Sequence, residues 1–456
     1  MCDKIDFEPD RVFRTYDISG ESRMDNKTIV GKRIWITIIL FGLFGQLAWM
    51  IENMYFNLFL YNTISGDPKA IASMVAASAI TATLTTILMG ALSDRVSKRK
   101  LFISVGYILW GLITLSFAFV SVDNMAKVFG GGNIVVITVL VVIIMDCIMT
   151  FFGSMANDGA FNAWVTDTTN LHNRGKVEGV IAILPLVAML IIFGGFDIMV
   201  QQDNWPLFFL ISGGLISFGG VIGIFLIKES DVKKSDTNYW DTLTYGFKPK
   251  TIKAHHRLYI YLIGLAVFGI AVQVYMPYFI IYIQRYLGID SYAILLGIVL
   301  ILASVVSVIV GRFIKADNKN KFFVPGVVVM AIGLILLFVT REPLLVGISG
   351  TIMMSGNLVL TTILNVKVRD NTPLDKVGHF QGIRMIFSVM IPMIIGPFIG
   401  AQVITNSGVL YEDLGVLKPV PTPGIFIASA VIVILTLVPV WFAVRQEKKA
   451  VKENHG

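Results

Sequence analysis

The feature that most constrains this chain is a series of twelve apolar segments, each long enough to cross a lipid bilayer. Segments such as 135–144 and 301–310 are almost continuously apolar. A transmembrane helix needs about 20 such residues, whereas the strands of a membrane β-barrel alternate apolar and polar side chains. Only 15% of the 456 residues are charged, against about 25% in soluble domains. We therefore predict an all-α membrane protein and exclude a water-soluble domain and a β-barrel.

The apolar windows also give approximate positions for the twelve helices, and the fourth helix is expected to continue towards residue 166. The predicted spans are 34–60, 71–93, 101–121, 134–156, 178–200, 207–227, 258–284, 292–314, 322–340, 344–366, 382–404 and 424–444. The first span is too long for the apolar region of a signal peptide and contains Glu52, so it should remain in the mature protein. The two cysteines, Cys2 and Cys147, cannot build a disulfide framework or a structural zinc site.

The basic residues predict the orientation in the membrane. With a cytoplasmic N-terminus, 32 of the 37 Lys and Arg residues fall in cytoplasmic segments and five fall outside. Positive residues favour the cytoplasmic side, so both termini should be cytoplasmic in a multi-pass protein of the plasma membrane. This distribution also accounts for the net charge of +7 without any nucleic-acid partner.

The longest polar connection, 228–257, divides the chain into two groups of six spans. The expected organisation is a cytoplasmic tail, a six-helix bundle, a cytoplasmic linker, a second six-helix bundle and a second tail, at 1–33, 34–227, 228–257, 258–445 and 446–456. Residues 165–179 and 368–382 match at a constant offset of 203 positions, including Asp167 with Asp370. Two similar halves are the architecture of many secondary transporters.

The connection between the second and third spans reads Gly90-Ala-Leu-Ser-Asp-Arg-Val-Ser-Lys-Arg-Lys100. It resembles the cytoplasmic signature of the major facilitator superfamily, and the resemblance covers about residues 34–445. It implies that the halves rock about a central cavity and that this loop helps to lock the outward-facing state. The expected cytoplasmic gate comprises Gly90, Asp94, Arg95, Arg99, Asp167, Arg174, Asp370 and Arg384.

A narrower resemblance points to the glycoside–pentoside–hexuronide cation symporters and the sucrose–proton symporters. Residues 42–45 resemble their first span, and Asp158-Gly-Ala-Phe161 resembles the end of their fourth. The resemblance implies that Asp158 helps to bind sugar or cation. The family's sugar-binding acid of the first helix falls on Leu47, and its two sodium-binding acids of the second helix fall on Ala82 and Thr86. Coupling is therefore expected to use protons rather than sodium.

Acidic residues within the spans are the candidate couplers. Charged groups in the hydrocarbon region cost about 2.5–3.5 kcal/mol on insertion scales and usually face a cavity. We select Glu52, Asp146 and Asp158, because a carboxyl group in a low dielectric favours its protonated form and can carry a proton. Asp197 lies near the end of the fifth span and is expected to be a solvated helix end. A structural role for Asp158, paired with a cytoplasmic base such as Arg95, is the alternative.

Polar side chains within the spans give the candidate substrate site. They are Asn53, Asn57, Asn157, Gln273, Tyr275 and Asn357, together with the three acids. Amides also join helices by hydrogen bonds. The tyrosines of the seventh span, at 275, 278 and 282, could stack on sugar rings or form a packing stripe. Both alternatives stay open from the sequence.

The leading hypothesis is a monomeric secondary transporter that moves a small solute, a sugar or glycoside, by alternating access and proton symport. Sodium is the less favoured ion, and no metal or other cofactor is expected. The chain has no zinc-protease, phosphate-loop or nucleophile-elbow motif, so we do not expect an enzyme. Alternatives are an exporter of amphipathic molecules, since 19 Met and 31 Phe residues suit an adaptable apolar cavity, or a receptor or lipid-moving protein on the same fold.

Overall fold

The computed structural model describes residues 31–96, 98–169, 173–229, 244–314, 318–373, 377–413 and 416–454. These residues contain twelve helical spans that are long and apolar enough to cross a membrane. The predicted number and order of the spans are therefore confirmed. The fourth span runs from Ile134 to Thr168, as the helical extension beyond residue 156 predicted.

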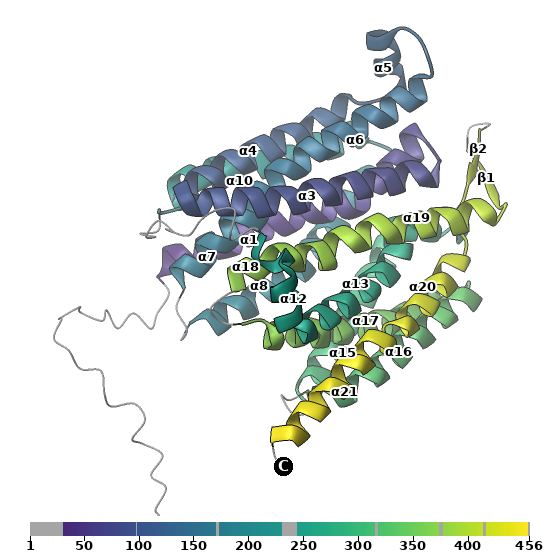
Figure 1. Cartoon of the computed structure of the whole chain (residues 1–456). Helices are drawn as coiled ribbons and strands as arrows, with labels where there is room; N and C mark the ends of the chain where they lie inside the picture. Colours follow the sequence, from purple (N-terminus) through teal and green to yellow (C-terminus); the bar gives the residue numbers. More distant parts are fainter. Residues whose placement is uncertain are drawn as a thin grey trace, which may run out of the picture.

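The first six spans and their connections contain the following elements (Figure 1): α1 (Lys32–Met50), η1 (Ile51–Tyr55), α2 (Phe56–Phe59), η2 (Leu60–Ile64), α3 (Pro68–Val96), α4 (Arg99–Ser116), η3 (Phe117–Phe119), α5 (Val122–Phe129), α6 (Ile134–Gly153), η4 (Ser154–Phe161), α7 (Asn162–Thr168), α8 (Arg174–Ile191), η5 (Ile192–Phe196), α9 (Asp197–Gln201) and α10 (Trp205–Leu226).

The remaining elements are η6 (Tyr245–Phe247), α12 (Pro249–Ala254), α13 (His256–Tyr275), η7 (Met276–Tyr278), α14 (Phe279–Ile281), η8 (Tyr282–Tyr286), α15 (Tyr292–Gly311), α16 (Lys319–Val339), α17 (Pro343–Asn371), α18 (Val377–Met385), η10 (Ile386–Met390), α19 (Ile391–Asn406), β1 (Leu410–Asp413), β2 (Val416–Pro419), α20 (Gly424–Leu435) and α21 (Leu437–Asn454).

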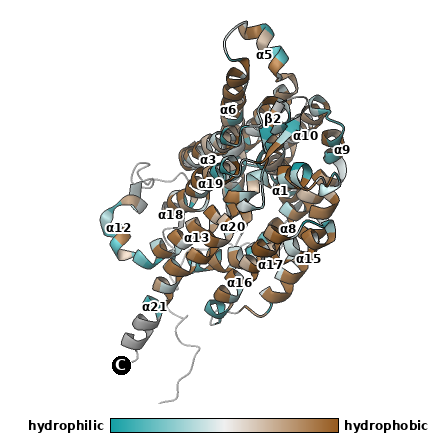
Figure 2. Cartoon of the chain, turned by 90° about the vertical axis from the view of Figure 1, so that its right-hand side faces the viewer, coloured by the Kyte–Doolittle hydropathy of each residue, from teal (hydrophilic) through white to brown (hydrophobic). Residues whose placement is uncertain are grey.

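The long helices lie side by side, and their connections gather at two ends. Figure 1 shows α5 and the β1–β2 hairpin at one end, which we call the hairpin end, and α7, α12 and the C-terminal part of α21 at the other. Figure 2 shows the helices largely hydrophobic along their length, with hydrophilic residues at α9, α12 and β2. Large apolar side chains such as Phe225 and Leu344 are about three-quarters exposed. Such a surface is stable against lipid rather than water.

The packing of the helices repeats between the first six spans and the last six. The pairs α1–α8, α3–α6 and α4–α10 correspond to α13–α19, α15–α17 and α16–α20. Between the two groups, α3 packs against α19 and α8 packs against α15. These two contacts are also equivalent, because α3 occupies the same place in the first half as α15 does in the second, and α8 the same place as α19. The predicted bounds of the two bundles stay a prediction, and this repeated packing supports the division.

One connection among the described residues differs from the all-α expectation. Leu410–Asp413 and Val416–Pro419 pair as an antiparallel hairpin in which Tyr411 lies opposite Lys418. Short strands in a connection leave no long apolar pattern, so a search for apolar windows cannot detect them. The predicted linker contains η6 and α12 in its described part. Residues 1–30 of the predicted tail and 230–243 of the linker lie outside the described residues.

Glycine permits close packing of the third and sixth spans. Gly213 of α10 faces the backbone of α4 at Gly111 and Leu115, and a methyl group at this position would collide with both. Gly220, two turns further along, faces the backbone of Ile108. Small residues that let helix backbones approach are a common means of association in membranes, where no hydrophobic force drives the helices together.

Adding a methyl group at this contact should therefore destabilise the protein. We expect Gly213→Ala to lower the free energy of unfolding by about 1–3 kcal/mol, the usual cost of overpacking, and to lower Tm by several degrees. Gly214→Ala is the matched control, because nothing lies within 4 Å of a methyl group there. The measurement is thermal unfolding of both purified variants; equal Tm values would contradict the close packing of α4 and α10.

Candidate substrate cavity

A cavity of about 400 Å³ lies between the two groups of spans. Spans 1, 2 and 4 form one wall, and spans 7 and 11 form the other. Its lining residues are Trp49, Met50, Glu52, Asn53, Met54, Asn57, Val75, Ser78, Ala79, Ala82, Asp158, Gln273, Met276, Pro277, Met385, Ser388, Val389 and Met393. The volume is within the range of small-molecule sites.

Turns of π-helix carry several of these residues. Glu52 and Asn53 lie in η1, Asp158 lies in η4, and Ser388 and Val389 lie in η10. A π turn inserts a residue into an α-helix and turns the following side chains to a new direction. Such insertions are frequent at functional sites, and here they occur in three helices around one cavity.

Glu52 has hydroxyl groups as its hydrogen-bond partners. Its Oε1 accepts a hydrogen bond from Thr150 at 2.7 Å and from Ser78 at 2.8 Å, and the two hydroxyl oxygens are 2.8 Å apart. The other carboxyl oxygen, Oε2, is buried without a hydrogen-bond partner. The side chain is 7% exposed, so this acid meets the cavity but is largely withdrawn from water.

Asp146 lies behind Glu52, away from the cavity lining. It is 1% exposed, interacts electrostatically with Glu52, and its Oδ1 has no hydrogen-bond partner. Two neighbouring buried carboxyl groups cannot both carry a charge cheaply when no cation balances them. Glu52 also interacts electrostatically with Asp158, another residue of the cavity lining, so the structure brings together all three acids that the sequence selected.

Asp158 lines the cavity on the fourth span, supported by buried polar groups. Asn157 donates a hydrogen bond from Nδ2 to Asp158 Oδ1 at 3.3 Å. The Tyr107 hydroxyl lies 2.9 Å from both Asn157 Oδ1 and the Phe41 carbonyl oxygen. Asn157 is therefore a positioning residue that links Asp158 to the third and first spans.

The amides of the first span lie at the cavity with only local hydrogen bonds. Asn53 donates to the Trp49 carbonyl and Asn57 to the Asn53 carbonyl, both at 2.7 Å. Asn57 Oδ1 is buried without a partner. Both contacts stay within one helix, so these amides keep hydrogen-bonding capacity for a solute.

The opposite wall is mainly apolar. Gln273 is its amide, beside Met276, Met385 and Met393. Tyr275 and Asn357 lie elsewhere: Tyr275 is buried with its hydroxyl 3.4 Å from Met353 Sδ, and Asn357 Nδ2 lies 3.4 Å from Met354 Sδ.

The seventh-span tyrosines follow the packing alternative rather than the stacking one. Tyr275, Tyr278 and Tyr282 are at most 1% exposed. The aromatic ring at the cavity is instead Trp49, which our sequence analysis missed. Trp49 lies three residues after Gln46 and four before Asn53, so its position on the polar stripe of the first span was a usable signal.

Asp197 corrects another sequence expectation. It is not a solvated helix end: it is 1% exposed and accepts hydrogen bonds from Tyr55 at 2.8 Å, from Gln201 at 2.5 Å and from Tyr292. Tyr55, Asp197 and Tyr292 come from spans 1, 5 and 8. The carboxyl group therefore joins the two groups of spans near the hairpin end.

Further hydrogen bonds join the halves at the same end. Arg285 donates to Asn62 Oδ1 at 3.1 Å, and Tyr61 donates to the Pro419 carbonyl at 2.9 Å. The Tyr278 hydroxyl lies 3.0 Å from the Pro68 carbonyl oxygen and 2.8 Å from that of Pro397. We call these contacts and the Asp197 cluster the hairpin-end seal. In the sequence, Arg285 had served only to assign topology.

The predicted gate residues form contacts within each half. Arg99, which is 3% exposed, pairs with Asp167 at 3.1 Å. Lys319 pairs with Asp370, the residue that the internal repeat matches to Asp167. In each half, a basic residue at the start of the third span of that half forms an ion pair with an acidic residue at the end of the fourth span.

The other gate residues are placed as follows. Gly90 faces Gly159 at an ordinary van der Waals distance, and a methyl group at Gly90 would meet the Gly159 Cα atom only at 4.0 Å. Arg384 donates to Asn365 Oδ1 at 3.0 Å, and Arg95 is exposed. The side chains of Asp94 and Arg174 lie outside the described part of the structure.

Metal binding finds no support in the described residues, among which no group of three or more His, Cys, Asp or Glu side chains could hold an ion. The cavity therefore offers acids, amides, hydroxyls, an indole ring and thioethers. This set can bind a small solute by hydrogen bonds and apolar contact, and can exchange protons at its carboxyl groups.

The sequence matches a known protein family, and the fold matches those of solved structures. The model of the Major Facilitator Superfamily matches residues 34–397. No curated protein sequence matches the chain significantly.

Three solved structures share the fold and are distant in sequence. A point mutant of the nucleoside transporter NupG superposes with a TM-score of 0.68 at 12% identity, covering 90% of this chain and 99% of that one. A bacterial homolog of the human lysosomal transporter Spinster, inward-facing and occupied, gives 0.64 at 12% identity, covering 90% and 96%. The xylose transporter XylE from E. coli, in a partially occluded inward-open conformation, gives 0.64 at 13% identity, covering 89% and 97%. At these identities the likeness establishes the fold alone.

Weakening the Asp197 cluster should loosen the hairpin-end seal. We expect Tyr292→Phe to remove one hydrogen bond to a carboxyl group, a contact of about 1.5–3 kcal/mol, and to raise amide hydrogen exchange in residues 55–66 and 285–292. Tyr282→Phe is the control, since its buried hydroxyl has no hydrogen-bond partner. Hydrogen exchange measured by mass spectrometry checks this, and unchanged exchange in Tyr292→Phe would refute the role of Asp197 in the seal.

Proposed function

The chain belongs to the major facilitator superfamily, and from this premise we propose that it transports a small sugar or glycoside by alternating access with proton symport. The observation that carries the proposal is the state of Glu52. This acid lies at the cavity with hydroxyl partners on one carboxyl oxygen and no partner on the other. Among the described lining residues none is Lys or Arg, so no fixed cation balances it.

Proton coupling follows from the cost of such a charge. An unpaired carboxylate in a protein interior costs several kcal/mol, and a proton from the solvent removes that cost. Glu52 and Asp146 together hold the proton in this proposal, and Asp158 passes it between them and the open side of the cavity. Ala82 stands at one position where the cation symporters that the sequence resembles have a sodium-binding acid; it lines the cavity, and its methyl side chain supplies no ligand for sodium.

The polar wall supports a hydroxylated solute. Asn53, Asn57, Asp158 and Gln273 present donors and acceptors to one space, beside the indole ring of Trp49. Sugar hydroxyls are donors and acceptors in turn, and the apolar face of a sugar ring can lie on an aromatic ring. This combination is the reason for preferring a sugar or glycoside.

We further propose that both termini are cytoplasmic, that the host membrane is the plasma membrane, and that a monomer is the working unit. In that orientation the hairpin-end seal closes the extracellular side. The cavity then exchanges with the cytoplasm in this conformation, and breaking the seal is part of the change to the outward-facing state.

A second candidate is export of amphipathic organic molecules. It is favoured by the methionines of the lining, Met50, Met54, Met276, Met385 and Met393, because flexible thioether side chains adapt to varied apolar surfaces.

Uptake into proteoliposomes separates these candidates. Labelled glycosides, hexuronides and a lipophilic cation are each tested under a proton gradient, a sodium gradient and no gradient. We expect a glycoside or hexuronide to accumulate only under the proton gradient. Accumulation with sodium alone would contradict the coupling ion, and movement of the lipophilic cation alone would favour the export candidate.

The coupling acids give a sharper prediction. We expect Glu52→Gln and Asp158→Asn each to reduce proton-driven accumulation at least ten-fold while leaving solute exchange at equal concentrations measurable, because exchange needs no net proton release. Asp123→Asn is the control, since Asp123 is exposed on α5. Asp158→Asn protein that still accumulates solute like the wild type would rule out a coupling role for Asp158.

A further inference from the structure

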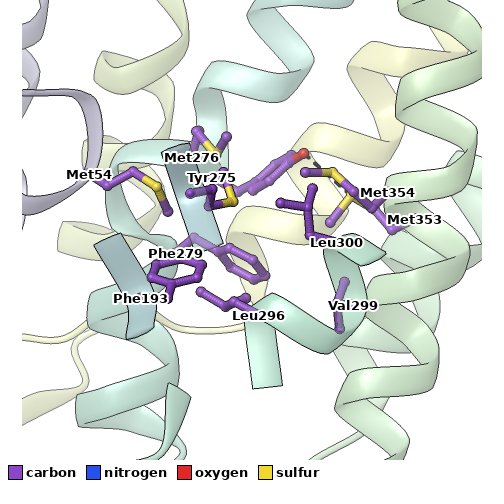
Figure 3. Close-up of a pocket in the computed structure, with 11 residues that line it drawn as sticks. Met54, Phe193, Tyr275, Met276, Phe279, Leu296, Val299, Leu300, Met353 and Met354 are labelled. Atoms are coloured by element: carbon purple, nitrogen blue, oxygen red, sulfur yellow. Dashed lines mark hydrogen bonds between the residues drawn. The ribbon is translucent and has the colours of Figure 1, made fainter. Parts of the chain in front are cut away.

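A second, smaller cavity adjoins the first and is almost entirely apolar. Its volume is about 30 Å³, and we call it the methionine slot (Figure 3). It is lined by Met54, Met189, Phe193, Tyr275, Met276, Phe279, Leu296, Val299, Leu300, Met353 and Met354. A cavity lined in this way stays dry and suits an apolar guest.

The slot and the substrate cavity are separated by two side chains that both spaces share. Met54 and Met276 line both spaces, so they form the partition between them. In Figure 3 both lie at one side of the slot, across from Met353 and Met354. Asn53 and Gln273 lie close in sequence to this partition, so a solute bound against them would have the slot within reach of an attached group.

The lining of the slot is made largely of flexible side chains. Five of its eleven side chains are methionine, which is unbranched, has three rotatable bonds and fills irregular spaces. The Tyr275 hydroxyl contacts Met353 Sδ at 3.4 Å, a weak hydrogen bond that a guest can displace at low cost. A 30 Å³ space can thus open for a larger group by rotation of thioethers.

The chemistry of the walls favours an aromatic guest. Phe193, Tyr275 and Phe279 supply ring faces and edges, and sulfur–aromatic contacts contribute about 0.3–1.5 kcal/mol each. Both groups of spans contribute to the slot, the first six through Met54 and Phe193 and the last six through the other two rings. A guest would consequently touch both halves at once.

We propose that the methionine slot receives an aromatic substituent of the transported solute, so that the chain prefers aryl glycosides to free or methyl glycosides. This inference rests on the proposed transport of glycosides and names their class. The sugar lies on the acid and amide wall of the cavity, and the aryl group passes between Met54 and Met276 into the slot.

The test is competition between methyl, phenyl and 2-naphthyl β-D-glucosides and β-D-galactosides for binding to the full-length protein in lipid nanodiscs. We expect the phenyl form of the bound sugar to bind at least ten-fold more tightly than the methyl form. Leu300→Phe fills the slot and should reduce this preference at least five-fold. Met353→Ala enlarges the slot and should shift the preference from phenyl towards naphthyl.

Leu302→Phe is the matched control, because Leu302 lies on the same helix but is 49% exposed. Thermal unfolding of each variant shows that it is folded. Equal binding of the methyl and phenyl forms by the wild type, or an unchanged preference in folded Leu300→Phe and Met353→Ala proteins, would overturn the slot but leave glycoside transport standing. A wild-type protein that binds none of these glycosides would overturn both proposals.

Discussion

The constraint on which this structure depends is that a polar group in the hydrocarbon region must find its partner inside the protein. Asp197 and Glu52 are both acids in apolar helices, and the number of their donors separates their roles. Asp197 accepts three hydrogen bonds, two of them from tyrosines on opposite halves. Glu52 accepts two on one oxygen and none on the other. A satisfied acid can fasten helices together, whereas an unsatisfied acid at a cavity remains available to a proton.

The twofold repeat explains the frame but not the cavity. Arg99 with Asp167 and Lys319 with Asp370 occupy equivalent places, and the helix pairs repeat. The walls of the cavity do not: acids line it from the first six spans, and Gln273 with three methionines lines it from the last six. The acids therefore lie on one half only, whereas apolar side chains line the cavity from both halves. A solute that touches both walls contacts the acids of one half and the methionines of the other.

The sequence was sufficient to predict the features that depend on long apolar segments. The twelve spans follow from apolar length. The direction of the side chains around the cavity could not be predicted. A helical pattern assumes about 3.6 residues per turn, and the π turns η1 and η4 each break that period. Asn157 and Asp158 were both candidate site residues, and of these two neighbours Asp158 lines the cavity while Asn157 supports it with a hydrogen bond.

The burial of Asp197 by distant segments of the chain could not be predicted from the sequence either. The solvated interpretation of Asp197 failed because Tyr55 and Tyr292 lie 142 and 95 residues away along the chain, and no local pattern records that they meet. Because its members come from distant segments, the Asp197 cluster connects spans of both halves. Of the three hydrogen bonds to Asp197, only that from Tyr292 crosses between the halves, because Tyr55 and Gln201 lie in the same half as Asp197. A separation of the halves at the hairpin end would therefore have to break the bond from Tyr292. The specific contact between the halves at this end is therefore made by a few polar groups, among them Tyr292, Tyr61 and Arg285, whereas lipid can cover apolar surface equally well when helices are apart.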